Sequence, residues 1–427
     1  MRSKLFRLVL ILATVFVLAA GLWSKRESFG QRLLAFYVTQ QTSQPSSIPH
    51  VPPSGITFPF ELVNQHVMLE VSVNGSRPLW FILDTGDRWA VLDRQRAKEM
   101  GLQLAGEIPV AGVGPKSSTA AFVKDAAFSI SGLAGFSQPV NLAIPLRNLA
   151  PFLGHDCDGI IGTEFIKNFV VELDYEARVI RLHDKNSFAY AGPGEIIPIR
   201  LDSQGQPIIR AEVTPVGSAP IQGEFKLDIG SGGSLALYSP FVAEHHLPGP
   251  NVNTIRRNGG GGTGGATAGQ YGRLAMLRIG KFNLGNPLTF FSEDKAGNFS
   301  RSAIQGNIGA QVFRKFRVFL DYSHDRVILE PNATFAEPLD RASSGLNVEA
   351  EGTDYKTFRI KDVLENSPAA EAGLRKDDVI TAIDGRAASD LTFSKLLEMF
   401  ERPASYKLTV GRGEQTLTVT LKPRKLV

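Results

Sequence analysis

Short apolar runs separated by turn-forming residues dominate the chain between about residues 56 and 331. The runs consist of Val, Ile, Leu and Phe, either alternating with polar residues or continuous, and Gly, Pro, Asn and Asp separate them. This pattern is typical of β-strands, because a half-buried strand alternates and a fully buried strand is apolar throughout. Helical patterns are brief, as at residues 93–100. We therefore predict a mainly β fold.

Two longer segments of this region repeat each other. "GIIGTEFIKNFVVELDYEARVIRL" (159–182) and "GNIGAQVFRKFRVFLDYSHDRVIL" (306–329) align without gaps at an offset of 306 − 159 = 147, with nine of 24 positions identical. A second pair of stretches, "FILDTG" and "FKLDIG", recurs with nearly the same offset, because 228 − 84 = 144. Two motifs in the same order at similar spacing predict two homologous β lobes, at 56–185 and 186–335. Each unit is far longer than a solenoid repeat.

The acid in each copy of the shorter motif ends an apolar run and is followed, one residue later, by glycine. A buried strand would carry the acid to its end, and glycine would allow the sharp turn that follows. If the two lobes pack face to face, the carboxylates of Asp84 and Asp228 meet near the local twofold axis and share a proton. One acid can then act as general base on a water while the other protonates a scissile carbonyl.

These motifs resemble the aspartic peptidases, and most closely the retropepsin-like single-chain members found in bacteria. "LDTG" and the downstream "IIG", in two copies, carry the resemblance, which covers most of residues 56–331. It implies that Asp84 and Asp228 are the catalytic acids and that no cofactor or metal is needed. It also implies a set of residues that support the active-site loops: Thr85, Gly86, Gly230, Ser231, Ile161, Gly162 and Gly309.

Two departures from the family pattern bear on activity. Ile229 replaces the Thr or Ser whose hydroxyl bonds across the lobes in the family, and losing such a buried partner costs about 1–3 kcal/mol. Asp87 stands where Ser or Ala is usual. A third carboxylate beside the pair would make further ionisation harder, whereas a side chain turned outward toward Arg88 would be harmless.

Family members cover the cleft with a glycine-bearing hairpin, and two stretches are candidates for it. "VAGVGPKSS" (110–118) follows Asp84, and "NGGGGTGGATAGQYG" (258–272) follows Asp228. The alternative for the second stretch is a plain loop. It is not a phosphate-binding loop, because no Gly-Lys-Ser/Thr follows it.

The C-terminal region, 339–425, resembles a PDZ domain. "LENSPAAEAGLRKDDVITAIDGRAASDLTFSKLLEMF" carries the resemblance, with a capped helix, a strand, a tight turn and an amphipathic helix. It implies that a peptide C-terminus binds by strand addition at a carboxylate-binding loop formed by Gly345, Leu346, Asn347 and Val348. Asn347 replaces the usual glycine and is expected to adopt a left-handed conformation. The alternative is a packing domain without a ligand.

The N-terminal residues 1–27 are expected to be a signal peptide or membrane anchor. Arg2, Lys4 and Arg7 precede an uncharged apolar run from Leu8 to Trp23, which is 23 − 8 + 1 = 16 residues long. That length lies between a signal-peptide core and a full membrane span. A linker at 28–55 follows. We therefore expect an exported protein, either periplasmic or anchored in the inner membrane and facing the periplasm.

Composition limits the remaining possibilities. A chain of 427 residues is too long for one core, so about two to four domains are expected. The net charge of +4 with no long basic tract makes nucleic acid an unexpected partner. The single cysteine, Cys157, excludes an intrachain disulfide and a four-thiolate zinc site. With His155 it could form a nucleophile pair, or it could be a semi-buried thiol at the start of a strand.

Two functions follow from these observations. The first is an exported aspartic endopeptidase that hydrolyses peptide bonds and uses its PDZ domain to recruit a protein or peptide substrate. The second, favoured by Ile229 and Asp87, is a catalytically impaired pseudo-peptidase that acts as a peptide-binding scaffold in the cell envelope.

Overall fold

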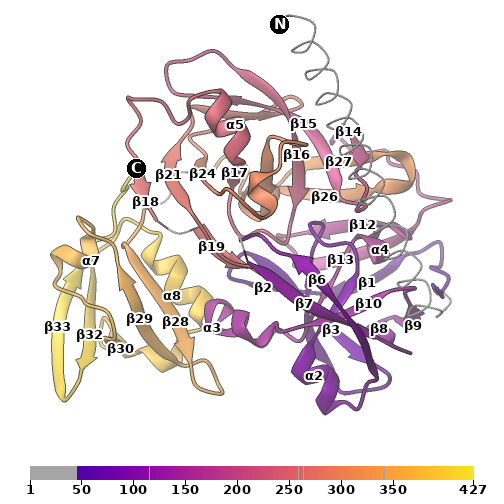
Figure 1. The fold of residues 1–427 in the computed structure, drawn as a ribbon, viewed down its shortest axis with the longest axis horizontal. Coiled ribbons are helices and arrows are strands. Elements are labelled where there is room, and N and C mark those ends of the chain that lie inside the picture. The colour runs from indigo at the N-terminus through magenta and orange to yellow at the C-terminus, as the bar shows by residue number, and fades with distance from the viewer. Residues whose placement is uncertain (1–45, 115, 258, 263, 340–341) are drawn as a thin grey trace, which may run out of the picture.

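The structure is a computed structural model of the chain and describes residues 46–114, 116–257, 259–262, 264–339 and 342–427 (Figure 1). The segment predicted as a signal peptide or anchor, and most of the predicted linker, lie outside these residues. No helix in the described part is both long and apolar enough to cross a membrane. The predicted mainly β fold, with a PDZ domain after the β lobes, is confirmed.

The two lobes are joined by antiparallel pairing of strands β12 (Phe169–Asp174) and β26 (Phe316–Asp321). Val171 pairs with Leu320 and Leu173 pairs with Val318. Since 171 + 147 = 318 and 173 + 147 = 320, each strand pairs with its own repeat running in the opposite direction. A local twofold axis therefore passes beside the central pair, Glu172 and Phe319.

The strands flanking this pair obey the same symmetry. The sheet runs in the order β1-β13-β12-β26-β27-β14, so that equivalent strands lie at equal distances from the axis. The outer strands are β1 (Ile56–Pro59), β13 (Val179–Asp184), β27 (Arg326–Pro331) and β14 (Glu195–Leu201).

Each lobe then repeats one series of strand pairings. In the first lobe β4 runs parallel to β11, β11 antiparallel to β5, β5 parallel to β10, and β10 antiparallel to β7. In the second, β16, β25, β17, β24 and β21 pair in the same way. The first series is β4 (Leu79–Leu83), β11 (Gly159–Ile161), β5 (Ala90–Asp93), β10 (Asn141–Ile144) and β7 (Ser117–Val123). The second is β16 (Ile221–Asp228), β25 (Gly306–Gly309), β17 (Leu235–Leu237), β24 (Leu288–Ser292) and β21 (Gly269–Arg273).

The remaining elements of the lobes complete the sheets and cover their ends. The strands are β2 (Glu61–Val63), β3 (His66–Val73), β6 (Leu104–Ala111), β8 (Ala127–Ile130), β9 (Leu133–Ser137), β15 (Pro207–Thr214), β18 (Ile255–Arg256), β22 (Met276–Ile279) and β23 (Phe282–Gly285). The helices are α2 (Arg94–Glu99), α3 (Ala150–Leu153), α4 (Thr163–Ile166), α5 (Ser239–Glu244) and α6 (Ala310–Phe313). One apolar core runs through both lobes, from Phe81 and Phe128 to Phe313 and Phe316.

The C-terminal domain has a core of its own and lies to one side of the lobes (Figure 1). Its sheet runs in the order β28-β29-β30-β32-β33, with β31 paired to β30. The elements are β28 (Leu346–Glu351), β29 (Thr357–Val363), β30 (Val379–Ile383), β31 (Arg386–Ala387), β32 (Tyr406–Arg412), β33 (Gln415–Leu421), α7 (Pro368–Glu371) and α8 (Phe393–Phe400). Strand β28 lies at the edge of this sheet, so one side of it is free of backbone pairing with another strand.

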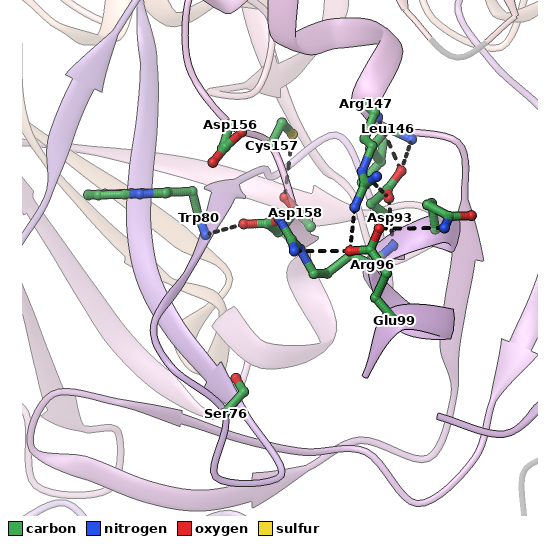
Figure 2. A network of polar contacts seen from close by, with 12 residues as sticks. Ser76, Trp80, Asp93, Arg96, Glu99, Leu146, Arg147, Asp156, Cys157 and Asp158 are labelled. Carbon is green, nitrogen blue, oxygen red and sulfur yellow. Dashed lines mark hydrogen bonds and ion pairs between the residues drawn. The ribbon is translucent and has the colours of Figure 1, made fainter. Parts of the chain in front are cut away.

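Buried carboxylates fasten the base of the first lobe (Figure 2). Asp158, only 3% exposed, accepts a hydrogen bond from the backbone amide of Trp80 at 3.0 Å and from Nε of Arg96 at 2.7 Å. The backbone amide of Asp93 donates to the carbonyl of Asp158 at 2.6 Å. Strand β4, helix α2 and the start of β11 are therefore held together by one aspartate.

A second buried carboxylate, Asp93, extends this network toward α3. Its side chain caps α2 by accepting from the amide of Arg96 at 2.8 Å. It also accepts from the amides of Leu146 and Arg147, at 2.9 and 3.1 Å. Arg147 in turn pairs with Glu99 at 2.6 Å. The chain segment that leads into α3 is thus fixed to helix α2, which follows β5.

Replacing Asp158 by alanine should lower the free energy of unfolding by about 2–4 kcal/mol, because the amide of Trp80 loses its partner and Arg96 keeps only its pair with Glu99. Chemical denaturation of the two proteins measures the loss. Glu107→Ala is the matched control, since Glu107 forms an exposed pair with Arg94 and should change stability by no more than about 0.5 kcal/mol. Equal effects of the two substitutions would contradict a structural role for Asp158.

Candidate active site

Asp84 and Asp228 lie at the ends of equivalent strands and face each other's turns. Asp84 directly follows β4, and Asp228 is the last residue of β16. A methyl group added to Gly86 would lie 2.7 Å from both carboxylate oxygens of Asp228, and one added to Gly230 would collide with the carboxyl group of Asp84. Each acid therefore lies against the glycine of the other motif, and only glycine permits this approach.

The pKa of Asp84 is raised well above its usual range. Burial is the largest cause, and the neighbouring charges of Asp228 and Asp87 act in the same direction. The backbone amide of Gly86, which donates to Oδ1 of Asp84 at 2.6 Å, and the charge of Lys226 oppose the shift. Asp84 is therefore a carboxyl group that holds its proton at a pH where an exposed aspartate is ionised.

One hydroxyl makes the cross-lobe contact between the acid loops. The fully buried side chain of Thr85 donates to the carbonyl of Leu227 at 2.7 Å and accepts from the amide of Ile229 at 3.0 Å. Ile229 is also fully buried and has no hydroxyl with which to return these bonds. The contact is thus made from the first lobe only.

In the first lobe the glycine after β11, Gly162, supports the acid loop. A methyl group on Gly162 would lie 2.7 Å from the carbonyl oxygens of Asp87 and Arg88. Those carbonyls accept hydrogen bonds from the amides of Thr163 and Glu164, at 2.9 and 2.8 Å. Ile161 contributes its carbonyl, which accepts from the amide of Asp84 at 2.9 Å.

The second lobe repeats this support. A methyl group on Gly309 would lie 2.7 Å from the carbonyl oxygen of Ser231 and would collide with that of Gly233. The amide of Ala310 donates to Ser231 at 2.8 Å, as Thr163 donates to Asp87 in the first lobe. The turn residues that the family resemblance selects therefore gather around the two acids.

Two polar residues that lie beside Asp228 were not predicted as site residues from the sequence. Nζ of Lys226 lies 3.4 Å from Oδ2 of Asp228, and Nδ2 of Asn307 donates to the same oxygen at 2.9 Å. Both are buried; Lys226 is 8% exposed. A signal existed in the sequence, because a lysine two positions before the acid stands in a strand end that is otherwise apolar, "FKLD".

Asp87 belongs to the same group of charges. Burial raises its pKa to about 6; the charge of Lys226 opposes this shift and that of Asp228 adds to it. Arg88 does not draw it outward, since the guanidinium of Arg88 pairs with Glu164 at 3.4 Å and lies over the ring of Trp89 at 4.2 Å. The inward alternative for Asp87 is therefore the one that the structure supports.

His66 and Tyr322 are further titratable groups near the acids. Nδ1 of His66 and the hydroxyl of Tyr322 are buried without a hydrogen-bond partner in the described part of the chain. Burial lowers the pKa of His66, against the charge of Asp228, and raises that of Tyr322, to which Asp84 and Asp228 add. Both groups are consequently neutral near pH 7.

Glycine hairpins from the two lobes meet at their tips. The first is formed by β6 and β7, and the second by β19 (Gly259–Gly262) and β20 (Gly265–Thr267). The amide of Lys116 donates to the carbonyl of Gly264 at 2.9 Å, and a methyl group on Gly114 would collide with the same stretch of backbone. The two candidate flaps thus touch through backbone that only glycine allows to come so close.

Cys157 is a buried thiol outside this site. It is 3% exposed, and burial, with the charge of Asp158, raises its pKa to about 12. His155 instead packs edge-on against Trp80 and contacts the carbonyl of Asp156 through Nδ1 at 2.9 Å. A thiol with a raised pKa is a poor nucleophile, so the structure favours the buried-thiol alternative.

The loop that the sequence predicts to bind a carboxylate, in the C-terminal domain, differs in one respect from the expectation. Gly345 has the positive φ, of +80°, whereas Asn347 lies within β28 at a bulge opposite Asp362. The left-handed position is therefore Gly345. Glycine is also needed there because the side chain of Ser367 leaves no room for a Cβ atom. The amide of Leu346 donates to the hydroxyl of Ser344 at 3.1 Å.

The free edge of β28 is covered by the first lobe. Helix α3 packs beside β28, and Figure 1 shows it on the side away from β29. Gly154, which ends α3, lies against Phe393 at the start of α8. The amide of Asn64 donates to the hydroxyl of Ser394 at 2.9 Å, and Tyr355 donates to Asp156 at 2.8 Å. A segment of the lobe thus occupies the side of β28 at which PDZ domains add a peptide strand.

Comparisons with known families agree with this arrangement. Residues 69–165 match the family model described as aspartyl protease, and residues 359–409 match the PDZ domain model. The chain therefore resembles an aspartyl protease in its first lobe and a PDZ domain in its C-terminal domain. This confirms the resemblance that the sequence motifs indicate. The protease match includes Asp84 and the supporting strand β11 and ends before the second lobe.

The individual proteins to which this chain is similar are distant. A curated protein, the "Probable CtpA-like serine protease" of Staphylococcus haemolyticus (strain JCSC1435), is 23% identical over 139 residues, which are 32% of this chain and 26% of that protein. Soybean basic 7S globulin has a TM-score of 0.39 at 10% identity, covering 67% of this chain and 98% of its own. The HtrA3 PDZ domain with a phage-derived ligand has a TM-score of 0.18 at 21% identity, covering 20% and 86%.

Replacing Thr85 by valine should lower the free energy of unfolding of the lobes by about 1–3 kcal/mol, because two buried backbone groups lose their shared partner. Ile229→Thr tests the other half of the contact against its isosteric control, Ile229→Val. If the new hydroxyl finds the reciprocal groups, Ile229→Thr is at least as stable as Ile229→Val in chemical denaturation. A threonine variant less stable than the valine variant by 1 kcal/mol or more would show that no partner is within reach.

Proposed function

We propose that this protein is an exported aspartic endopeptidase that hydrolyses peptide bonds with water activated between Asp84 and Asp228. The observation that carries the proposal is the placement of each acid against the glycine of the other motif. The family match at residues 69–165 supports protease chemistry. Water attacks the carbonyl carbon as one carboxylate takes its proton, and the other carboxyl group protonates the carbonyl oxygen.

The site residues around the acids serve to hold this pair in place. Thr85 ties the acid loops across the lobes, and the turns at Gly162 and Gly309 support each loop from below. Such fixed geometry matters because a base and an acid must act on the same water and carbonyl group in one arrangement. The proposed mechanism uses no metal and no cofactor.

The PDZ domain would recruit the protein or peptide substrate by binding its C-terminus. The peptide carboxylate would accept hydrogen bonds from the loop amides of residues 345–348. One of these amides, that of Leu346, here donates to the hydroxyl of Ser344. The peptide would add as a strand to β28, and α3 would have to move aside first. The apolar run in residues 1–27 supports export, with the protein in the periplasm or anchored in the inner membrane.

A second candidate is a pseudo-peptidase scaffold that binds peptides without cutting them. The observation that favours it is the single cross-lobe hydroxyl, since Ile229 leaves half of the contact unmade. A pair held by one cross-lobe hydroxyl instead of two is less rigid, and catalysis by the acids depends on their being held in place.

Asp84→Asn and Asp228→Asn should each reduce peptide cleavage by at least about a hundredfold, because each removes one of the two proton-transfer groups. Cleavage of a quenched fluorescent peptide library between pH 3 and 7 measures this. Asp125→Asn is the control, since Asp125 is exposed at a turn where asparagine tolerates the positive φ. A parent protein that binds peptides but cuts none would favour the scaffold, and variants as active as the parent would refute the dyad.

Weakening the contact between α3 and the PDZ domain should strengthen binding of peptides with an apolar C-terminal residue. Tyr355→Phe with Ser394→Ala removes both hydrogen bonds to the lobe, and the affinity should rise about two- to tenfold as the competing contact is lost. Isothermal titration of the full chain measures the change. Glu414→Gln, in the exposed β32–β33 turn, should leave the affinity unchanged. An unaltered affinity in the double variant would contradict competition by α3.

A further inference from the structure

The two acids stand above different pairs of side chains, although the strands beneath them are symmetry-related. In the first lobe, β4 pairs with β11 so that Ile82 lies opposite Ile160. In the second, β16 pairs with β25 so that Lys226 lies opposite Asn307. These positions are equivalent, because 82 + 144 = 226 and 160 + 147 = 307. All four residues are buried, so the difference is one of chemistry and not of exposure.

The apolar pair gives Asp84 no polar support from below. Ile82 and Ile160 can neither donate a hydrogen bond nor offer a charge, and the one recorded donor to the Asp84 carboxyl is the amide of Gly86. A carboxyl group above such a pair is best accommodated in its neutral form, since burying an unpaired charge is costly.

The polar pair does the reverse for Asp228. Two residues apart on β16, Lys226 and Asp228 point to the same face of the strand, which places the ammonium 3.4 Å from Oδ2. Asn307 directs its amide nitrogen to the same oxygen at 2.9 Å. In this orientation the amide donates, which suits an accepting oxygen at Asp228.

Other titratable groups also face this pair. Asp84, Asp87 and Asp228 face Lys226 from the acid loops, Tyr238 faces it from the end of β17, and the largest favourable influence on Lys226 is Asp228. His66 and Tyr322 are neutral near pH 7, as described above. The one cation in this group is therefore Lys226, and its nearest carboxylate is Asp228.

We propose that Lys226 and Asn307 are positioning residues that fix the roles of the two acids: Asp228 is held as the carboxylate base and Asp84 is the proton donor. In the first step Asp228 takes a proton from water, the water oxygen bonds to the carbonyl carbon, and Asp84 gives its proton to the carbonyl oxygen. In the second, a hydroxyl of the resulting diol returns a proton to Asp84, the carbon–nitrogen bond breaks, and Asp228 protonates the leaving amine. Both acids end as they began.

The catalytic part of this inference rests on the proposed peptidase function, but the unequal charge of the two acids does not. Thermal unfolding therefore tests it in the absence of activity. Asp84→Asn, which replaces a neutral acid by a neutral amide, should change the Tm by no more than about 2 °C. Asp228→Asn strands a buried ammonium and should lower the Tm by roughly 5–10 °C.

The double variant Lys226→Met with Asp228→Asn should recover most of that loss, since neither charge remains. If Asp228→Asn does not fold, the comparison is between this double variant and Lys226→Met, and the double variant should be the more stable. Equal Tm losses for Asp84→Asn and Asp228→Asn, or additive losses in the double variant, would overturn the unequal charge whatever the protein cleaves.

The pH dependence of cleavage tests the catalytic consequence. Lys226→Met removes the positive charge that lies 3.4 Å from Oδ2 of Asp228, so the acid limb of kcat/KM should move upward by about one pH unit or more. Lys226→Arg keeps the charge and should leave the limb near that of the parent. If Lys226→Met cleaves with the parent's pH profile, the assignment of roles fails while the proposed peptidase function stands; if the parent cleaves nothing, that function fails and the Tm comparison alone decides the charges.

Discussion

The antiparallel pairing of β12 with β26 is the constraint on which the rest of the structure depends. It joins each strand to its own repeat about a local twofold axis, and so fixes where every equivalent element of the two lobes must lie. Strands β4 and β16 then end beside each other, and the acids that they carry meet at the turns. A shift by one residue along this contact would exchange the side chains on the two faces of the strand that moves, and nearly all of those side chains are buried. The position of the carboxylates is thus a consequence of strand register, and the loops that hold them only refine it.

The features of this arrangement that occur in both lobes could be predicted from the sequence. The two motifs and their offsets of 144 and 147 are local patterns, and duplication made them visible without any knowledge of contacts. The chemistry that distinguishes the lobes was harder to see, because it depends on which residue lies opposite which. Lys226 and Asn307 are 81 positions apart and become neighbours only through the pairing of β16 with β25. The left-handed residue of the PDZ loop was misplaced at Asn347 for a similar reason: a bulge in β28 and the close approach of Ser367 put it at Gly345.

Two contacts hold parts of the chain in place: one joins the tips of the two candidate flaps, and the other holds the PDZ domain against the first lobe. The hairpin tips meet through close glycine backbone and a hydrogen bond from Lys116 to Gly264, and Val113 of the first tip packs against the apolar cluster of Tyr238, Phe290 and Phe299 in the second lobe. The PDZ domain is held to the first lobe by α3 and by the hydroxyls of Tyr355 and Ser394. Asp93 fixes the segment that leads into α3, so the helix beside the PDZ edge strand is attached to the same lobe that carries Asp84.

The two acids can have unequal surroundings because both lobes belong to one chain, whereas the two acids of a symmetric dimer must have identical surroundings. In a dimer of identical lobes, a lysine beneath one acid would stand beneath both, and each carboxylate would be held ionised with no proton to donate. Isoleucine beneath both would leave the pair to share a proton, with either acid able to serve as base. Within one chain, Ile82 and Ile160 can lie under Asp84 while Lys226 and Asn307 lie under Asp228. Lys226 would disable a symmetric pair, but here it selects one of the two protonation states of the acid pair. Ile229, which has no hydroxyl, lies in the same second lobe as Lys226 and Asn307.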